Sequence, residues 1–252
     1  MFPPFSFWSP SGPPFDPAVF NATTWQRAPF AGYNWAGIAS AGVSGNREVR
    51  GFSGPGVGVG GTLNGLAAIR HDATAGACGS EYFNNGGGAA LDIHDVVDPG
   101  STTGPTPYTV MGLCKILSAA AAAGAPYQNL TFINGQARWG IYFNNTKLGV
   151  WHFTGAFPFV EVNHPGVGVA FKWCVRWDGT NAQIDIGATP GTPTALAAVS
   201  TLNGVPCQIG DDTFNHGVTG SHDMWDQITM KSSLSDANRD NYFSYLHSRY
   251  GV

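Results

Sequence analysis

The residues of this chain best suited to chemistry are carboxylates grouped with histidines. The tightest group is the run of residues 92–98, Asp-Ile-His-Asp-Val-Val-Asp. On a regular strand, Asp92 and Asp98 share one face and Asp95 takes the other. The run fits three roles: the acidic face of an edge strand, which we favour, a calcium site on Asp92, Asp95 and Asp98, or an acid/base pair. A hard cation such as calcium needs further oxygen ligands from elsewhere in the chain.

A second group follows a strand predicted over Val205–Asp212. It consists of Asp211, Asp212, His216, His222, Asp223 and Asp226. One interpretation is a loop site in which Asp223 and Asp226 ligate calcium and Asp211, Asp212 and His222 hydrogen-bond a sugar. The other, which we favour, is that these are ordinary loop residues bonded to their own backbone. Zinc is not expected, because the sequence has no His pair at i, i+4 and no close Cys pair.

Catalysis by paired acids is not expected. A retaining glycosidase needs two carboxyl groups roughly 5 Å apart, whereas Glu48, Glu81 and Glu161 are isolated in the sequence. Residues 54–61 formally match GxGxxG, but no helix start follows, so they predict a loop rather than a dinucleotide site. No GxSxG motif occurs. We therefore predict a non-enzymatic protein. We expect no cofactor, and the alternative is a bound calcium ion.

Flat aromatic rings are the other candidate binding groups, because the apolar faces of sugars stack on them. Of the eight tryptophans, Trp35 and Trp139 lie near glycines and are the candidates for exposed sugar-binding rings. Trp173 and Trp177 fall on the apolar face of a strongly alternating strand and are expected in the core.

Composition restricts the elements that can position these residues. Charged residues make up 11% of the 252 residues and aromatic residues 13%. Three Glu and four Lys are too few for long surface helices, and the aromatic content argues against disorder. The net charge is −4 without a basic run, so no nucleic-acid partner is expected. No apolar stretch reaches the roughly 18 residues that a membrane span requires.

Short strands separated by glycine-rich loops are predicted through most of the chain. Period-2 alternation is strongest from Val169 to Trp177, and Asp178-Gly179 then predicts a hairpin to a strand over 182–186. Other strands are expected within the ranges 66–71, 108–116, 130–133, 137–143, 147–154, 205–212 and 225–230.

The C-terminal residues change to a helical period. Ser235 is a suitable N-cap, and Gly251 is suited to the left-handed position after the last turn. Phe243, Leu246 and Tyr250 recur at helical spacing and should be buried. One helix is therefore expected to close an otherwise β domain.

The first twenty residues form a separate segment before a single domain over residues 21–252. Six prolines in residues 1–20 exclude regular helix and central strand, so an extended docking arm is expected. Its aromatic side chains need cover, either from this domain or from a neighbouring subunit; they include Phe2, Phe5, Phe7, Trp8 and Phe15. The four cysteines are far apart and no export signal is recognisable, so free, mostly buried thiols are expected.

Three sequence features together resemble a known family. They are Trp177-Asp178-Gly179-Thr180, Ile209-Gly210, and the C-terminal stretch from Leu234 to Gly251. They are similar to the laminin-G-like subgroup of the concanavalin A-like lectin/glucanase superfamily. The resemblance implies an all-β, antiparallel jelly-roll sandwich of two sheets. This chain departs from the family pattern at Gln227 and Asn238, where acids are usual, and it lacks the ExDxxE motif of the glucanase branch.

Modules of this family are common in bacteriophage virion proteins, and that implies a function. We expect a non-enzymatic structural or adhesive protein of a tailed bacteriophage, on the capsid or tail, assembled in the host cytoplasm. Its expected partners are other virion proteins and host surface glycans. We also expect it to form a homo-oligomer, with a trimer as the expected state. The alternative is a calcium-assisted carbohydrate-binding lectin, and the third candidate is a glycoside hydrolase.

Overall fold

The computed structural model describes fourteen segments of the chain. They are residues 25–29, 47–49, 61–63, 68–71, 81–84, 90–93, 100–101, 104–105, 107–118, 128–133, 139–198, 207–210, 221–230 and 232–252. The N-terminal arm, residues 1–20, lies outside these segments, and so does Cys78. No helix of the described segments is long and apolar enough to cross a membrane.

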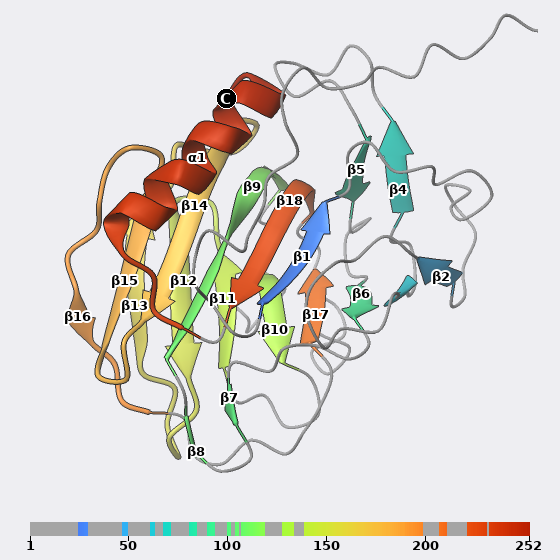
Figure 1. Ribbon diagram of the computed structural model, residues 1–252. Helices are drawn as coiled ribbons and strands as arrows, with labels where there is room; N and C mark the ends of the chain where they lie inside the picture. Colours follow the sequence, from blue (N-terminus) through green and yellow to red (C-terminus); the bar gives the residue numbers. More distant parts are fainter. Residues whose placement is uncertain are drawn as a thin grey trace, which may run out of the picture.

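The described strands form two large antiparallel sheets that pack face to face (Figure 1). The first sheet has the order β16 (Thr194–Ala195), β15 (Asn181–Ile186), β14 (Ala170–Trp177), β9 (Tyr108–Ser118), β18 (Ser221–Met230), β5 (Glu81–Asn84) and β4 (Ala68–His71), with β1 (Trp25–Pro29) paired to β18. The second has the order β13 (Phe159–Asn163), β12 (Lys147–His152), β11 (Trp139–Phe143), β10 (Gln128–Ile133), β17 (Cys207–Gly210), β6 (Ala90–Ile93), β3 (Gly61–Leu63) and β2 (Arg47–Val49).

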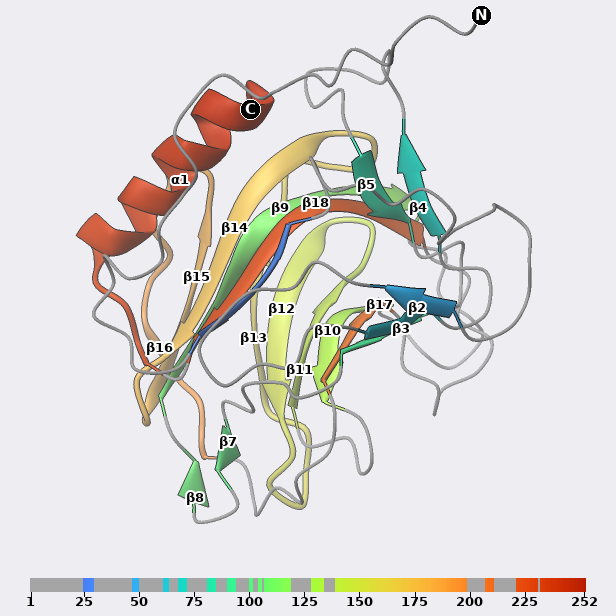
Figure 2. The same cartoon turned by 45° about the vertical axis from the view of Figure 1, so that its right-hand side comes forward.

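Two short strands, β7 (Gly100–Ser101) and β8 (Gly104–Pro105), pair with each other outside these sheets. The single described helix, α1 (Asp236–Tyr250), lies against the outer side of the first sheet (Figure 2). The predicted all-β sandwich with one C-terminal helix is confirmed.

The strongest predicted hairpin forms as expected. Trp177 of β14 pairs with Ala182 of β15, and Gly179 in the turn has φ = 110°, which favours glycine. Asp178 closes the turn, because its Oδ1 accepts from the backbone N–H groups of Thr180 (2.8 Å) and Asn181 (2.7 Å). These hydrogen bonds stabilise the charged form and lower the pKa of Asp178 to about 2.

The interior between the sheets is rich in aromatic rings, as the alternation of β14 predicts. Trp173 and Trp177 are fully buried, and Trp177 contacts the second sheet. Tyr108 of β9 stacks on Trp139 of β11, with ring centroids 4.7 Å apart, and His152 of β12 meets Trp177 edge-on at 5.1 Å. Contacts between rings of opposite sheets therefore join the two layers.

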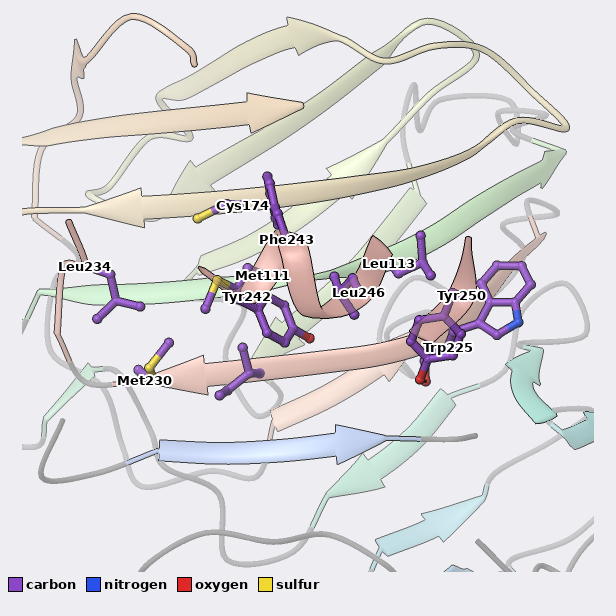
Figure 3. Close-up of a cluster of buried hydrophobic side chains, with 11 residues drawn as sticks. Met111, Leu113, Cys174, Trp225, Met230, Leu234, Tyr242, Phe243, Leu246 and Tyr250 are labelled. Atoms are coloured by element: carbon purple, nitrogen blue, oxygen red, sulfur yellow. The ribbon is translucent and has the colours of Figure 1, made fainter. Parts of the chain in front are cut away.

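The helix covers the other face of β14, β9 and β18 (Figure 3). Phe243, Leu246 and Tyr250 are buried there, as the helical spacing predicts. They pack on a mixed set from the first sheet and the segment before the helix: Met111, Leu113, Cys174, Trp225, Ile228, Met230 and Leu234. Arg239 and Tyr242, which the sequence did not mark as core residues, are buried as well.

The ends of α1 are capped as predicted. Ser235 Oγ accepts from the backbone N–H of Asn238 (3.3 Å), and Asp236 places a negative charge in the first turn. Gly251 adopts φ = 72° and its N–H donates to the carbonyl of His247 (2.8 Å). The described cysteine side chains, Cys114 and Cys174, are free and buried, as expected.

Candidate functional site

The first acidic group is only partly described. Asp92 lies in β6, where it is opposite Gln208 of β17 on one side and Thr62 of β3 on the other. Because β6 has a neighbouring strand on both sides, the expectation that this strand forms a sheet edge is wrong. Asp95 and Asp98 lie outside the described segments, so the calcium and acid/base interpretations stay predictions.

The second group is divided between a strand and undescribed residues. The last strand begins at Ser221, four residues before its predicted start, because β18 pairs with β9 along its length. His222 and Asp223 therefore lie on a central strand, and the expectation that they belong to a loop is wrong; Asp226 lies within the part of the strand that was predicted over 225–230. Asp211, Asp212 and His216 lie outside the described segments.

The strand places the side chains of these three residues in separate surroundings. His222 faces the interior, edge-on to Phe143 with ring centroids 5.5 Å apart, and burial lowers its pKa to about 3. Asp223 Oδ2 lies 3.5 Å from the ammonium of Lys115. Asp226, fully buried beneath α1, accepts a hydrogen bond from the Tyr242 hydroxyl (3.1 Å).

This arrangement does not suit the predicted ligand roles. A neutral, buried imidazole cannot contact a sugar at the surface, so the assignment of His222 is wrong. Among the described residues, no three His, Cys, Asp or Glu side chains gather in a way that could hold a metal ion. Asp223 and Asp226 instead join β18 to the neighbouring strand and to the helix.

The two tryptophans predicted as sugar-binding rings have different outcomes. Trp139 is 1% exposed and stacks on Tyr108 inside the sandwich, so its assignment as an exposed ring is wrong. The neighbouring Gly140 does not expose it, because consecutive strand residues point to opposite faces. Trp35 lies outside the described segments.

The interior also holds a buried polar pair that sequence reasoning did not single out. Tyr108 donates its hydroxyl to His152 Nε2 (2.8 Å), and His152 Nδ1 donates to the carbonyl of Ala197 (2.7 Å). The carbonyl oxygen can only accept, so the proton resides on Nδ1. Burial lowers the pKa of His152 to about 4 and raises that of Tyr108. This neutral, fully bonded pair stabilises the sandwich and has no surface to offer a ligand.

A candidate binding surface lies on the outward side of β11, β12 and β13. On these strands Phe143 and His152 contact rings of the first sheet, so the alternate residues point away from it. Strand register places Phe159 opposite Trp151, which is itself opposite Gly140. We call the outward rings of these strands and of the following loop the aromatic face: Tyr142, Trp151, Phe153, Phe157 and Phe159.

Two glycines let rings lie flat against the sheet. A Cβ atom built on Gly140 would lie 2.8–3.0 Å from three atoms of the Trp151 indole. A Cβ atom on Gly149 would collide with the ring of Tyr142. In each case the glycine is the direct cross-strand partner of the ring that covers it. The glycines are therefore required for this surface.

The exposed part of the aromatic face comes from the hairpin between β12 and β13. Phe157 is 51% exposed and Phe159 61%, whereas Trp151 is 5% exposed beneath them. Phe157 meets Trp151 edge-on at 5.5 Å and lies 5.1 Å from the ring of Phe153. The hairpin is closed by the N–H of His152, which donates to the carbonyl of Pro158 (3.1 Å). Large apolar rings are thus held at the surface by a hydrogen-bonded turn.

Polar groups adjoin the rings on the same surface. The Tyr142 hydroxyl donates to Glu161 Oε1 (2.7 Å), and Glu161 lies two residues from Phe159 on β13. Lys147 and Asn163 are opposite each other in the next row. Rings beside a carboxylate can bind a ligand that has both an apolar face and hydroxyl groups, which is the chemistry of a pyranose.

Sequence reasoning missed this surface although a signal was present. Residues 139–142 read Trp-Gly-Ile-Tyr, and residues 148–151 read Leu-Gly-Val-Trp. Each of these two predicted strands has a glycine two residues before an aromatic residue. This repeat indicates that the aromatic ring of one strand lies over the glycine of the adjacent strand. Which glycine lies opposite which ring becomes apparent only when the register of β11 and β12 is known.

The comparisons with known proteins support the fold. No protein-family model matches the chain, and no curated protein matches it. A solved structure titled for the cell entry of botulinum neurotoxin type C through two ganglioside molecules aligns with a TM-score of 0.53 and 10% identity, over 71% of this chain and 46% of that one.

Two further structures give the same result. The binding domain of botulinum neurotoxin DC in complex with rat synaptotagmin II aligns with a TM-score of 0.54 and 9% identity, over 71% of this chain and 45% of that one. The binding domain of Paraclostridial Mosquitocidal Protein 1 aligns with a TM-score of 0.50 and 8% identity, over 72% and 48%. The chain thus matches less than half of each neighbour, and at these identities the likeness is one of fold alone.

Proposed function

We propose that this chain is a non-enzymatic carbohydrate-binding module that holds a glycan on the aromatic face of β11–β13. The observation that supports this most directly is the exposure of Phe157 and Phe159 beside the Glu161 carboxylate. Exposed rings at the edge of a sheet keep apolar surface in contact with water, which is unfavourable. A ligand that covers the rings removes this surface from water and gains free energy of binding. Two of the solved structures of similar fold are binding domains, which supports the same class of function.

The pattern of the surface favours a glycan over a purely apolar ligand. Exposed Phe159 lies in one row of the sheet, and the next row along β13 presents Glu161, which accepts a hydrogen bond from the buried Tyr142. A lipid would remove water from the carboxylate and offer it no hydrogen-bond donor besides the Tyr142 hydroxyl, at a cost of free energy. A pyranose supplies both an apolar face for the rings and hydroxyl donors for the carboxylate.

The surroundings of three buried acids support a non-enzymatic role. Asp185 lies between two arginines, Asp223 faces Lys115, and Asp226 lies beneath the tyrosines of α1. Each of these carboxylates serves to join elements of the fold. A hydrolase would instead need two acids facing a common cleft.

We place this module in a virus particle, on the capsid or tail of a bacteriophage. The proposal is supported by the low charge content and by the proline- and aromatic-rich composition of residues 1–20, which suits docking onto neighbouring subunits. Proteomic analysis of purified particles tests this setting directly. Recovery of the chain with the capsid or tail proteins is expected, and its absence from intact particles would contradict the proposal.

The binding function is tested by glycan-array screening followed by titration calorimetry with the best ligand. Phe159→Ala and Phe157→Ala should each weaken binding about tenfold, because a stacked ring contributes roughly 1–1.5 kcal/mol. Val169→Ala is the matched control, because it shortens an apolar side chain that is 46% exposed outside the aromatic face. Equal affinity of Phe159→Ala and wild type would refute the proposal. Loss of binding on chelation would favour the calcium-assisted lectin.

A further inference from the structure

The outward side of β11–β13 is ordered in three rows with different chemistry. The first row contains Phe159 and Trp151, and the second contains Glu161 and Tyr142. The third contains Lys147 opposite Asn163. Because residues of one face are two positions apart, successive rows are roughly 7 Å apart along a strand. A ligand lying along β13 therefore meets rings, then a carboxylate, then an ammonium and an amide.

On the described strands β11–β13, the charged group nearest to Phe159 on this face is the Glu161 carboxylate. It lies one row from Phe159, whereas Lys147 lies two rows away, roughly 13 Å along the strand. A single sugar ring stacked on the first row reaches the second row but not the third. Its substituents therefore meet a negative charge before they meet a positive one.

The position of Glu161 is fixed rather than adaptable. Tyr142 donates to its Oε1 at 2.7 Å, and the ring of Tyr142 is itself seated over Gly149. A carboxylate has about four acceptor sites, and the tyrosine hydroxyl occupies one of them. The group is thus held in place for a ligand that donates hydrogen bonds.

From this order we infer that the aromatic face selects hexopyranoses whose ring substituents are hydroxyl or ammonium donors, and that it rejects sugars with a carboxylate on the stacked ring. The inference rests on the proposed function and specifies its ligand class. A hydroxyl or ammonium hydrogen-bonds to Glu161, and the ammonium adds charge attraction. A uronate or sialate would place two carboxylates in contact, and like charges at an interface disfavour binding.

The test compares three tetrasaccharides by calorimetry at pH 6.0: cellotetraose as the neutral probe, the glucosamine tetramer as the cationic probe and tetragalacturonate as the anionic probe. Wild-type protein should bind the neutral and cationic probes at least about tenfold more tightly than the anionic one. Glu161→Gln keeps the size of the side chain and an acceptor for Tyr142. It should lower affinity for the cationic probe and raise affinity for the anionic probe, each about fivefold.

Two variants separate this inference from the proposed function. Phe159→Ala should weaken binding of every probe by a similar factor, because stacking does not depend on charge. Tyr142→Phe should reduce the discrimination between probes, since it releases the Glu161 carboxylate.

The possible results point to different conclusions. If Glu161→Gln leaves the ratio of anionic to neutral affinity at the wild-type value, the inference is wrong while the proposed function stands. Tighter binding of tetragalacturonate than of cellotetraose by wild type would also overturn it. If neither these probes nor the array glycans bind, the proposed function fails, and the inference fails with it.

Discussion

Asp185 and Arg239 lie 3.0 Å apart, Oδ2 to Nη1, although 54 positions separate them in the sequence. The pair joins β15 to the first turn of α1. Arg176 of β14 reaches the same carboxylate oxygen at 2.8 Å, and the other oxygen accepts from the backbone N–H of Gly191 (2.8 Å). The fully buried Asp185 thus holds two arginines and a loop in place, and it fixes the position of the helix on the sheet.

Replacing this carboxylate should strongly destabilise the fold. In Asp185→Asn, two buried guanidinium groups lose the buried carboxylate between them and keep Asp236, whose side chain is 64% exposed, as the counter-charge that they share. We expect a loss of about 3 kcal/mol in the free energy of unfolding. Asp240→Asn is the control. Asp240 also pairs with Arg239, but its side chain is 60% exposed, so its loss should cost less than about 1 kcal/mol. Urea titration followed by tryptophan fluorescence measures both, and equal losses would contradict the role of Asp185.

The parts of the fold that the sequence predicts correctly are local ones. The β14–β15 hairpin depends on alternation and on Asp178-Gly179, which lie within one short segment. The helix depends on Ser235, on its apolar spacing and on Gly251. In each case the deciding interactions join residues a few positions apart, so a single sequence contains them.

The predictions that failed depend on long-range pairing. The residues around His222 include several aspartates, and this composition is typical of a loop. In the structure, pairing with β9 extends β18 through His222 and turns its side chain to the interior. Trp139 beside a glycine suggests exposure, but the second sheet turns it inward against Tyr108. The aromatic face was not predicted for the same reason. Gly149 and Tyr142 are cross-strand partners, and this pairing is known only from the strand register.

The contact between Gly149 and Tyr142 can be tested by a double-mutant cycle. Gly149→Ala places a methyl group in the ring of Tyr142, so we expect a destabilisation of about 1–3 kcal/mol and weaker glycan binding. In Gly149→Ala/Tyr142→Ala the collision is absent. The two losses should therefore be non-additive by at least about 1 kcal/mol in chemical unfolding. Strict additivity would show that the ring does not rest on the glycine.

Cysteine reactivity offers a test of the packing beneath the helix and between the sheets. Cys174 lies beneath α1 and Cys114 faces the interior; both are fully buried, and burial raises the pKa of each thiol. Because the thiolate is the reactive form, neither should react with iodoacetamide in the folded protein at pH 8. Both should react once the protein is unfolded in urea. Peptide mapping by mass spectrometry reads each site separately, and rapid native labelling of Cys174 would contradict the packed position of the helix.

Two of the buried histidines, His152 and His222, should make stability depend on pH in a defined window. Burial lowers the pKa of His152 to about 4 and that of His222 to about 3, whereas an unfolded histidine titrates near 6.5. Between these values the unfolded chain binds protons that the folded chain does not, so stability is complete above about pH 6.5 and declines as pH falls. From pH 7.5 to 5.0 each histidine should cost about 2 kcal/mol.

The carboxylates of Asp178 and Asp236 do not act in this window. The pKa values of Asp178 and Asp236 are lowered, so the stability that these groups contribute is lost only at more acidic pH. His152→Gln keeps a donor for Ala197 and an acceptor for Tyr108 but removes the titration, and it should reduce the decline by about half. Urea unfolding at the two pH values measures the difference. A decline of the same size in His152→Gln and wild type would contradict the neutral, hydrogen-bonded state assigned to His152.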